Sequence, residues 1–253
     1  MNPKLILTAL GFLTRLRMPA WVPFDPDSVA CAARWFALIG LLLGALAAGL
    51  LWLLAPGLGQ PLAVVLVLIL LLLLTGAFHE DGLADTFDGF WGGWERQRKL
   101  AIMKDSQIGT YGVLSLIGCL AIKAVALSQL HLGLAMVALL ASHAGGRTVA
   151  GLVPVLLPYA RSDEGSKTPQ RQRSPGFGDQ LALMACGAAP LLLLPQEAAA
   201  VVALVWAGAF GFMSWLMHRH IRGYTGDTLG ATEQVTECLT LIALVAMMNQ
   251  GWL

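Results

Sequence analysis

Long apolar stretches alternate with polar connections along the whole chain. Three runs without a charged residue cover positions 35–55, 62–78 and 198–217. Each is close to the roughly 17 to 25 residues that a helix needs to cross a bilayer. Such runs are too long and too continuously apolar for the strands of a barrel. The pattern therefore predicts an all-α, polytopic integral membrane protein built as a helical bundle.

Four weaker apolar stretches bring the expected number of transmembrane helices to about seven. They are interrupted by Lys123, by Arg147 and by several glycines and prolines. Their positions are 111–129, 131–157, 180–194 and 238–253. We expect a single integral membrane domain, residues 1–253. Its polar parts would be an amphipathic amino-terminal segment (1–33), an acidic catalytic loop (79–110), a cytoplasmic loop (159–180) and a second acidic loop (218–237).

The basic residues fall on one kind of connection. Short connections between the spans carry no lysine or arginine, whereas the long polar ones hold 14 of the 16 in the chain. Because basic loops stay in the cytoplasm, we expect the long connections, the amino terminus and the active site to lie on that side. With seven spans, the carboxyl terminus would lie on the other side.

The amino-terminal segment begins like a signal peptide but does not end like one. Arg15 and Arg17 stand where a small-residue cleavage site should be. Apolar residues between Leu5 and Leu16 recur at helical spacing, which is typical of a helix lying in the membrane interface. We therefore expect an uncleaved interfacial helix.

The composition excludes several other classes of protein. Hydrophobic residues make up 57% of the chain and charged residues only 12%. A soluble globular protein has about 25% charged residues. A net charge of +1 argues against a nucleic-acid partner held by bulk basicity. The four cysteines show neither zinc-ligand spacing nor the pattern of a disulfide framework.

The first acidic loop carries the most informative pattern. Asp81, Asp85 and Asp88 stand at i, i+4 and i+7, so a helix would place them on one face, about 5 to 6 Å apart. An acidic face of this kind can simply be solvated. Three like charges that close nevertheless favour a bound cation, and oxygen ligands suit Mg²⁺. Gly82 and Gly89 would let a ligand approach the backbone.

Further groups suited to phosphate chemistry follow in the same loop. Lys104 and Asp105 come just before the next span. Recognition of a phosphate through a metal needs cations as well as carboxylates. His79, beside the aspartate triplet, could accept a proton or donate to a phosphate.

The second acidic loop places Asp227 among glycines, with Glu233 and Glu237 four residues apart. Taken alone, the glutamates fit an ordinary helix start. Together with the triplet they would give two acidic clusters on one face, as a two-metal phosphoryl-transfer site requires. Arg147 lies within a span, where a charge costs at least about 2.5 kcal/mol, so we expect it to pair with a substrate phosphate or a protein carboxylate. Lys123 could reach the interface by snorkelling.

Three motifs and a short amino-terminal stretch stand out. They are HEDGLADTFDG (79–89), IMKDSQIGTYG (102–112), GYTGDTLGA (223–231) and FLTR (12–15). Together they resemble the cobalamin synthase family of adenosylcobinamide-GDP ribazoletransferases. The resemblance covers essentially the whole chain and implies a magnesium-dependent transferase of the bacterial inner membrane. Such an enzyme joins adenosylcobinamide-GDP to α-ribazole or its 5′-phosphate and releases GMP. Residues 161–177 match no motif of the family.

The resemblance and the residue pattern together suggest roles for the candidate residues. The expected magnesium ligands are Asp81, Asp85, Asp88 and Asp227. The expected catalytic residues are His79, Lys104, Asp105 and Arg147. The expected substrate contacts are Gly82, Gly89, Lys104, Arg147 and Asp227. The lipid bilayer is a further partner and a homo-oligomer is an open alternative, as are the number of ions and the identity of the general base.

Two other functions compete with this interpretation. A CDP-alcohol phosphotransferase also uses a D-G-x-x-A motif and magnesium at the membrane interface, but its motif has an arginine where this chain has Asp85. A membrane transporter could use Arg147 and Lys123. Transporters, however, place such groups near the midplane between repeats, and here the polar groups cluster at one face.

Overall fold

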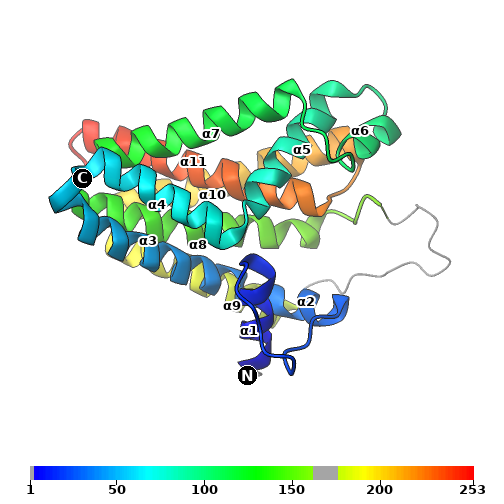
Figure 1. Cartoon of the computed structure of the whole chain (residues 1–253), viewed down its shortest axis with the longest axis horizontal. Helices are drawn as coiled ribbons and strands as arrows, with labels where there is room; N and C mark the ends of the chain where they lie inside the picture. Colours follow the sequence, from blue (N-terminus) through cyan, green and yellow to red (C-terminus); the bar gives the residue numbers. More distant parts are fainter. Residues whose placement is uncertain (1–2, 162–175) are drawn as a thin grey trace.

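The computed structural model describes residues 3–161 and 176–253, which form a bundle of long helices (Figure 1). Within these residues there is no β-strand, and an isolated parallel bridge joins Tyr159 to Tyr224. The all-α fold predicted from the apolar runs is confirmed. Most of the expected cytoplasmic loop 159–180 lies outside the described residues.

The described chain divides into long helices that run along the bundle and shorter helical elements at its ends and sides. The long helices are α3 (Phe36–Leu58), α4 (Gln60–Thr75), α7 (Thr110–Gln129), α8 (Leu132–Leu156), α10 (Gln196–Ile221) and α11 (Gly226–Asn249). The shorter elements are α1 (Pro3–Leu13), α2 (Pro26–Ala32), η1 (Ala33–Trp35), α5 (Phe78–Gly92), α6 (Arg96–Ile102), α9 (Phe177–Ala188) and η2 (Ala189–Leu193).

Five helical segments of the described chain are long and apolar enough to cross a membrane. They contain α3, α7, α8, α10 and α11. α4 qualifies only together with α5, from which it is bent by 87°, and this gives six candidates at most. The sequence led us to expect about seven. The remaining expected span corresponds to α9 and η2, which together form a shorter apolar segment, Phe177–Leu193.

The polar elements gather at one end of the bundle. Figure 1 shows α5, α6 and the start of α11 at that end, with the carboxyl terminus at the other. α1 crosses the direction of the long helices, as a helix lying in the membrane interface would. This arrangement agrees with the expectation that the long polar connections share one face.

α3 and α8 pack backbone against backbone. Gly44 of α3 is buried, and a Cβ added to it would lie only 2.6 Å from the carbonyl oxygen of Leu139. Lipid tails are as apolar as the helices, so close packing at small residues is a main source of helix association in membranes.

Replacing Gly44 by isoleucine should therefore lower the thermal unfolding midpoint of the purified protein in detergent. Overpacking of a core costs about 1–3 kcal/mol. Gly49 lies on the same helix but is exposed, with nothing within 4 Å of its Cβ position, so Gly49→Ile is the matched control. Equal midpoints for the two variants would contradict the packing described.

The start of α11 corrects one expectation from the sequence. Thr225 caps the helix by accepting a hydrogen bond from the amide of Thr228, so α11 begins at Gly226 rather than near position 238. As a result, Glu233 and Glu237 are only 1% and 2% exposed and lie inside the bundle, instead of in a cytoplasmic loop.

Candidate active site

A sharp break after α4 sets the position of the site. Gly76 and Ala77 have φ values of 67° and 55°, so α4 ends in a left-handed turn and α5 leaves at 87° to it. α5 carries four acidic side chains. We therefore place α5 outside the membrane, at the polar end of the bundle.

α5 packs closely against the first turns of α11. A Cβ added to Gly82 would lie 2.7 Å from the carbonyl oxygen of Asp227, and one added to Gly230 would lie 3.1 Å from that of His79. These glycines bring the two acidic segments together. Gly82 thus serves helix packing, which corrects the expectation that it admits a ligand, and Gly89 likewise packs against the backbone of α6.

Asp81, Asp85 and Asp227 form an open group of carboxylates between α5 and α11, which we call the aspartate cluster. Asp81 is exposed and the other two are half-buried. Burial, together with the charges of Asp81, Asp227 and Asp88, raises the pKa of Asp85 to about 7. A divalent cation would relieve this repulsion, and carboxylate oxygens suit Mg²⁺. The donor set therefore fits a magnesium site.

The carboxylate oxygens of the aspartate cluster do not converge on one point. Among the described residues, His143, Glu233 and Glu237 are the group that brings three potential ligand atoms within 4.8 Å of one another. The aspartates would reach a common ion by rotation of their side chains, or through water and substrate oxygens, which Mg²⁺ commonly retains.

Arg161 is a site residue that the sequence analysis did not identify. Its guanidinium lies 3.0 Å from a carboxylate oxygen of Asp227. The one available signal was its place as the first cation after α8, since no spacing rule links it to Asp227. The segment that follows it, residues 162–175, lies outside the described residues.

Asp88 has a different environment from the other aspartates of α5. It is buried, and its two carboxylate oxygens accept hydrogen bonds from the amides of Gly109 (2.7 Å) and Gly112 (2.9 Å). These bonds tie the start of α7 to α5. In this arrangement Asp88 holds the chain together, and its expected role as a magnesium ligand stays a prediction.

Glu237 is the centre of a buried network of charged side chains. It lies 2.5 Å from Lys123 and from His143, and 3.5 Å from Arg147. Lys123 is 4% exposed, so the expectation that it snorkels to the interface is wrong. Its ammonium group is held inside by Glu237 and by the side chain of Gln234, 2.6 Å away.

Glu233 continues this network toward α5. Its carboxylate lies 2.6 Å from Arg147 and 3.0 Å from His79. Of the two anions expected for Arg147, the structure shows the protein carboxylate. Lys123 and Arg147 already neutralise the glutamates, so the close group of His143, Glu233 and Glu237 is better described as an ion-pair network than as a metal site.

Lys104 and Asp105 lie on the link between α6 and α7. Both are exposed, and Asp105 accepts a hydrogen bond from the amide of Gln107. Within the described part of the chain, no contact joins either residue to the aspartate cluster. Their expected catalytic roles stay predictions.

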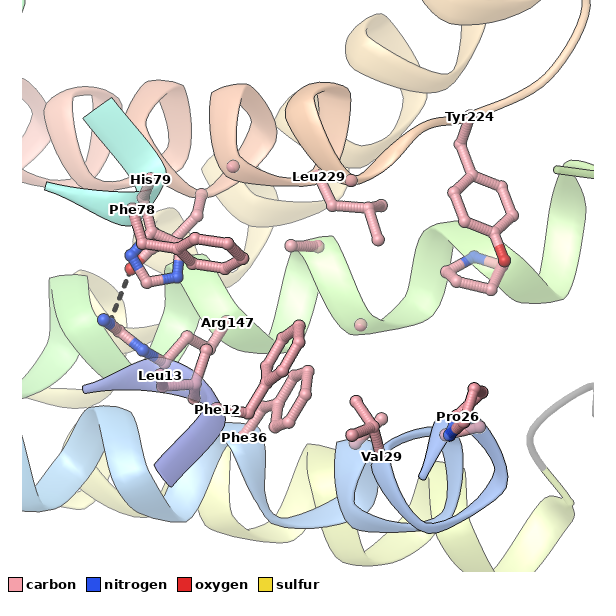
Figure 2. A pocket seen from close by; sticks show the side chains of 18 of the residues that line it. Phe12, Leu13, Pro26, Val29, Phe36, Phe78, His79, Arg147, Tyr224 and Leu229 are labelled. Atoms are coloured by element: carbon pink, nitrogen blue, oxygen red, sulfur yellow. Dashed lines mark ion pairs between the residues drawn. The ribbon is translucent and has the colours of Figure 1, made fainter. Parts of the chain in front are cut away.

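A cavity of about 460 Å³ lies between the amino-terminal segment and the helices α8 and α11 (Figure 2). Phe12 and Phe36 form part of its apolar wall, and Tyr224 lies toward one end. His79 and Arg147 lie at the other end, where Figure 2 marks an ion pair of the arginine. The apolar pattern along the chain did not indicate this cavity, because its walls come from segments far apart in the sequence.

Comparisons with known proteins agree over almost the full length. The family model described as cobalamin-5-phosphate synthase matches residues 5–245. An adenosylcobinamide-GDP ribazoletransferase of Shewanella baltica is 42% identical over 248 residues, covering 97% of this chain and 95% of that protein. Proteins of the same name are also 42% identical: that of Shewanella putrefaciens with coverages of 95% and 93%, and that of Shewanella oneidensis with 96% and 94%. No solved structure matches the chain.

Proposed function

Since the chain belongs to the cobalamin-5-phosphate synthase family, we propose that it is an adenosylcobinamide-GDP ribazoletransferase of cobalamin synthesis. It joins adenosylcobinamide-GDP to α-ribazole or its 5′-phosphate and gives adenosylcobalamin or its 5′-phosphate plus GMP. One observation carries the proposal beyond the resemblance. Asp81 and Asp85, from the first half of the chain, meet Asp227, from the second, at the polar end of the bundle.

The reaction is a phosphoryl transfer. A ribose hydroxyl oxygen attacks the phosphorus nearer cobinamide and forms a new P–O bond. The bond from this phosphorus to the bridging oxygen breaks, GMP leaves with that oxygen and its electron pair, and the hydroxyl proton passes to a base. Charge develops on the phosphoryl and bridging oxygens, so positioning and cations supply most of the catalysis.

The aspartate cluster is the proposed holder of Mg²⁺. Bound there, the ion would neutralise pyrophosphate oxygens and help the leaving group depart. Asp81, Asp85 and Asp227 supply the carboxylates that fix its place. Arg161, which pairs with Asp227, could instead bind a phosphate oxygen if Asp227 held the ion, because guanidinium groups bind both carboxylates and phosphates well. Lys104, on an exposed link, is a further candidate for phosphate charge.

His79 is one candidate for the proton acceptor, and a carboxylate of the aspartate cluster is the other. Glu233, 3.0 Å from His79, holds the histidine ring in place, as an orienting carboxylate does for a general base. His79 also lines the cavity and stands two residues before Asp81. Asp105 is the exposed alternative for orienting the nucleophile.

We further place the protein in the bacterial inner membrane, with the amino terminus and the aspartate cluster on the cytoplasmic side. The distribution of lysine and arginine supports this orientation. The exposed large apolar side chains of the long helices, among them Trp52, Leu73 and Leu204, suit contact with lipid.

Release of GMP by the purified protein tests the function. Protein in detergent is incubated with adenosylcobinamide-GDP and α-ribazole 5′-phosphate, with Mg²⁺ or with a chelator. We expect GMP and the joined corrinoid in equal amounts, loss of turnover with the chelator, and recovery when Mg²⁺ is added back. Faster turnover of a CDP-alcohol would contradict the function, as would corrinoid uptake into proteoliposomes without GMP. Full turnover in the presence of the chelator would contradict the proposed role of Mg²⁺.

A further inference from the structure

The long sides of the cavity are built from flat and branched apolar side chains (Figure 2). Phe12 stacks on Phe36, with ring centroids 5.5 Å apart and planes within 5° of parallel. Phe78 meets Phe12 edge-on, and Leu229 closes the side formed by α11. The volume of about 460 Å³ lies within the range of roughly 300–1,000 Å³ found for small-molecule pockets. Walls of this kind suit a flat apolar ring.

One end of the cavity is polar and closed. Arg147 and Glu233 line it and are only 3% and 1% exposed. They form an ion pair at 2.6 Å, yet the Nε of Arg147 and both carboxylate oxygens of Glu233 make no hydrogen bond of normal geometry with the described residues. A buried donor without an acceptor is unfavourable, so a ligand atom that accepts from Arg147 would be stabilised there.

The other end opens at the start of α11. Gly226, the residue before Asp227, lines this end, is exposed, and has empty space where a Cβ would stand. Tyr159 and Tyr224 border the same end, with their rings edge to face at 5.5 Å. A molecule that fills the cavity and extends past Gly226 therefore approaches Asp227, which follows Gly226 in the chain but does not itself line the cavity.

We propose that the cavity binds the dimethylbenzimidazole base of α-ribazole, with the ribose directed through the open end toward Asp227. This inference rests on the proposed function and assigns the second substrate of that site. The base is flat and apolar, and its one unsubstituted ring nitrogen accepts a hydrogen bond, which matches the unused donor of Arg147. The ribose hydroxyl then faces the aspartate cluster, where the phosphorus must be attacked, so in this arrangement a carboxylate of that cluster, and not His79 at the closed end, takes its proton.

Other parts of the substrates fit this cavity less well. Guanine carries donors and acceptors around its edge, and the apolar walls would leave most of them unsatisfied. The corrin ring with its side chains is larger than the whole cavity. A lipid acyl chain would suit the walls, but it would gain nothing from Arg147, Glu233 and His79 at the closed end.

Filling the cavity from two walls tests the proposal. Ala150 lines it from α8 and Val29 from α2, so Ala150→Leu and Val29→Trp each remove part of the space. We expect the dissociation constant of α-ribazole to rise about tenfold or more in each variant. It is measured by equilibrium dialysis against purified protein in detergent, without Mg²⁺ or adenosylcobinamide-GDP. Ala207→Leu, the same substitution on the exposed face of α10, should bind like the wild type.

Each other outcome overturns the assignment. Normal α-ribazole binding by folded Ala150→Leu and Val29→Trp would overturn it. If Ala150→Leu fails to fold, the result for Val29→Trp decides alone. A raised KM for adenosylcobinamide-GDP with unchanged α-ribazole affinity would assign the cavity to the other substrate. Loss of bound phospholipid with unchanged α-ribazole affinity would assign it to lipid.

The binding measurement separates this inference from the proposed function, since it needs no turnover. Cavity-dependent binding of α-ribazole by a protein that releases no GMP would refute the enzymatic reaction and leave the cavity assignment standing. Release of GMP by a protein whose α-ribazole affinity is changed by neither cavity variant would support the enzymatic reaction and refute the cavity assignment.

Discussion

Replacing Asp85 by asparagine should slow the release of GMP by about a thousandfold or more, because a bound metal supplies several kcal/mol of charge stabilisation and each 1.4 kcal/mol is worth about tenfold in rate. Burial, together with the neighbouring charges of Asp81 and Asp227, raises the pKa of Asp85, so a cation bound among these carboxylates would favour its ionised form. Asparagine keeps the shape of the side chain but removes the charge that the ion requires. The measurement is the rate of GMP release at saturating Mg²⁺.

A second measurement makes the Asp85→Asn result specific to the metal. Mn²⁺ binding to the purified protein, followed by electron paramagnetic resonance, should be lost or strongly weakened, while the thermal unfolding midpoint stays near that of the wild type. Glu197→Gln removes one exposed carboxylate at the start of α10 and should change neither quantity. Turnover and Mn²⁺ binding of Asp85→Asn equal to those of the wild type would refute the assignment.

Replacing Glu237 by glutamine should destabilise the protein by about 3–5 kcal/mol, the typical cost of removing one partner from a buried ion pair. The carboxylate is 2% exposed and lies within ion-pair distance of Lys123, His143 and Arg147. Without it, two buried cations share the single charge of Glu233. The free energy of unfolding can be measured by titration with a denaturing detergent.

Removing Lys123, the cation left without its carboxylate, should restore part of the lost stability. The double variant Lys123→Met, Glu237→Gln replaces the closest pair by neutral side chains, and we expect it to be more stable than Glu237→Gln alone. If Lys123→Met and Glu237→Gln are each less stable than the double variant, the destabilisation arises from the charge that each single substitution leaves unpaired. A Glu237→Gln protein as stable as the wild type would show that the network contributes little.

The sequence predicted most of the fold because apolar runs report directly on contact with lipid. The runs at 35–55 and 198–217 fall within the helical stretch Pro26–Leu58 and within α10. The start of α11 was misplaced because its first half is polar, and polar residues in a sequence are indistinguishable from a loop until their partners are known. Those partners, Lys123 and Arg147, come from α7 and α8.

The candidate site was only partly predictable for a related reason. Helical spacing was enough to group Asp81 with Asp85, and residue type was enough to suggest Mg²⁺. The contact of Asp227 with α5 depends on the close approach of Gly82 and Gly230. No periodicity in the sequence indicates that these two glycines are neighbours in space. The local pattern also counted Asp88 with the metal ligands, although its oxygens bind two amides of a segment more than twenty positions away.

The buried charges between α7, α8 and α11 also constrain how the protein is made. Lys123 and Arg147 are synthesised before the carboxylates that neutralise them, because α11 follows α7 and α8 in the chain. Until Glu233 and Glu237 arrive, the nascent chain holds two uncompensated cations within the apolar helices α7 and α8, where an unpaired charge is unfavourable. Formation of these ion pairs thus waits for α11, and chains cut short before it would present quality-control proteases with a recognisable defect.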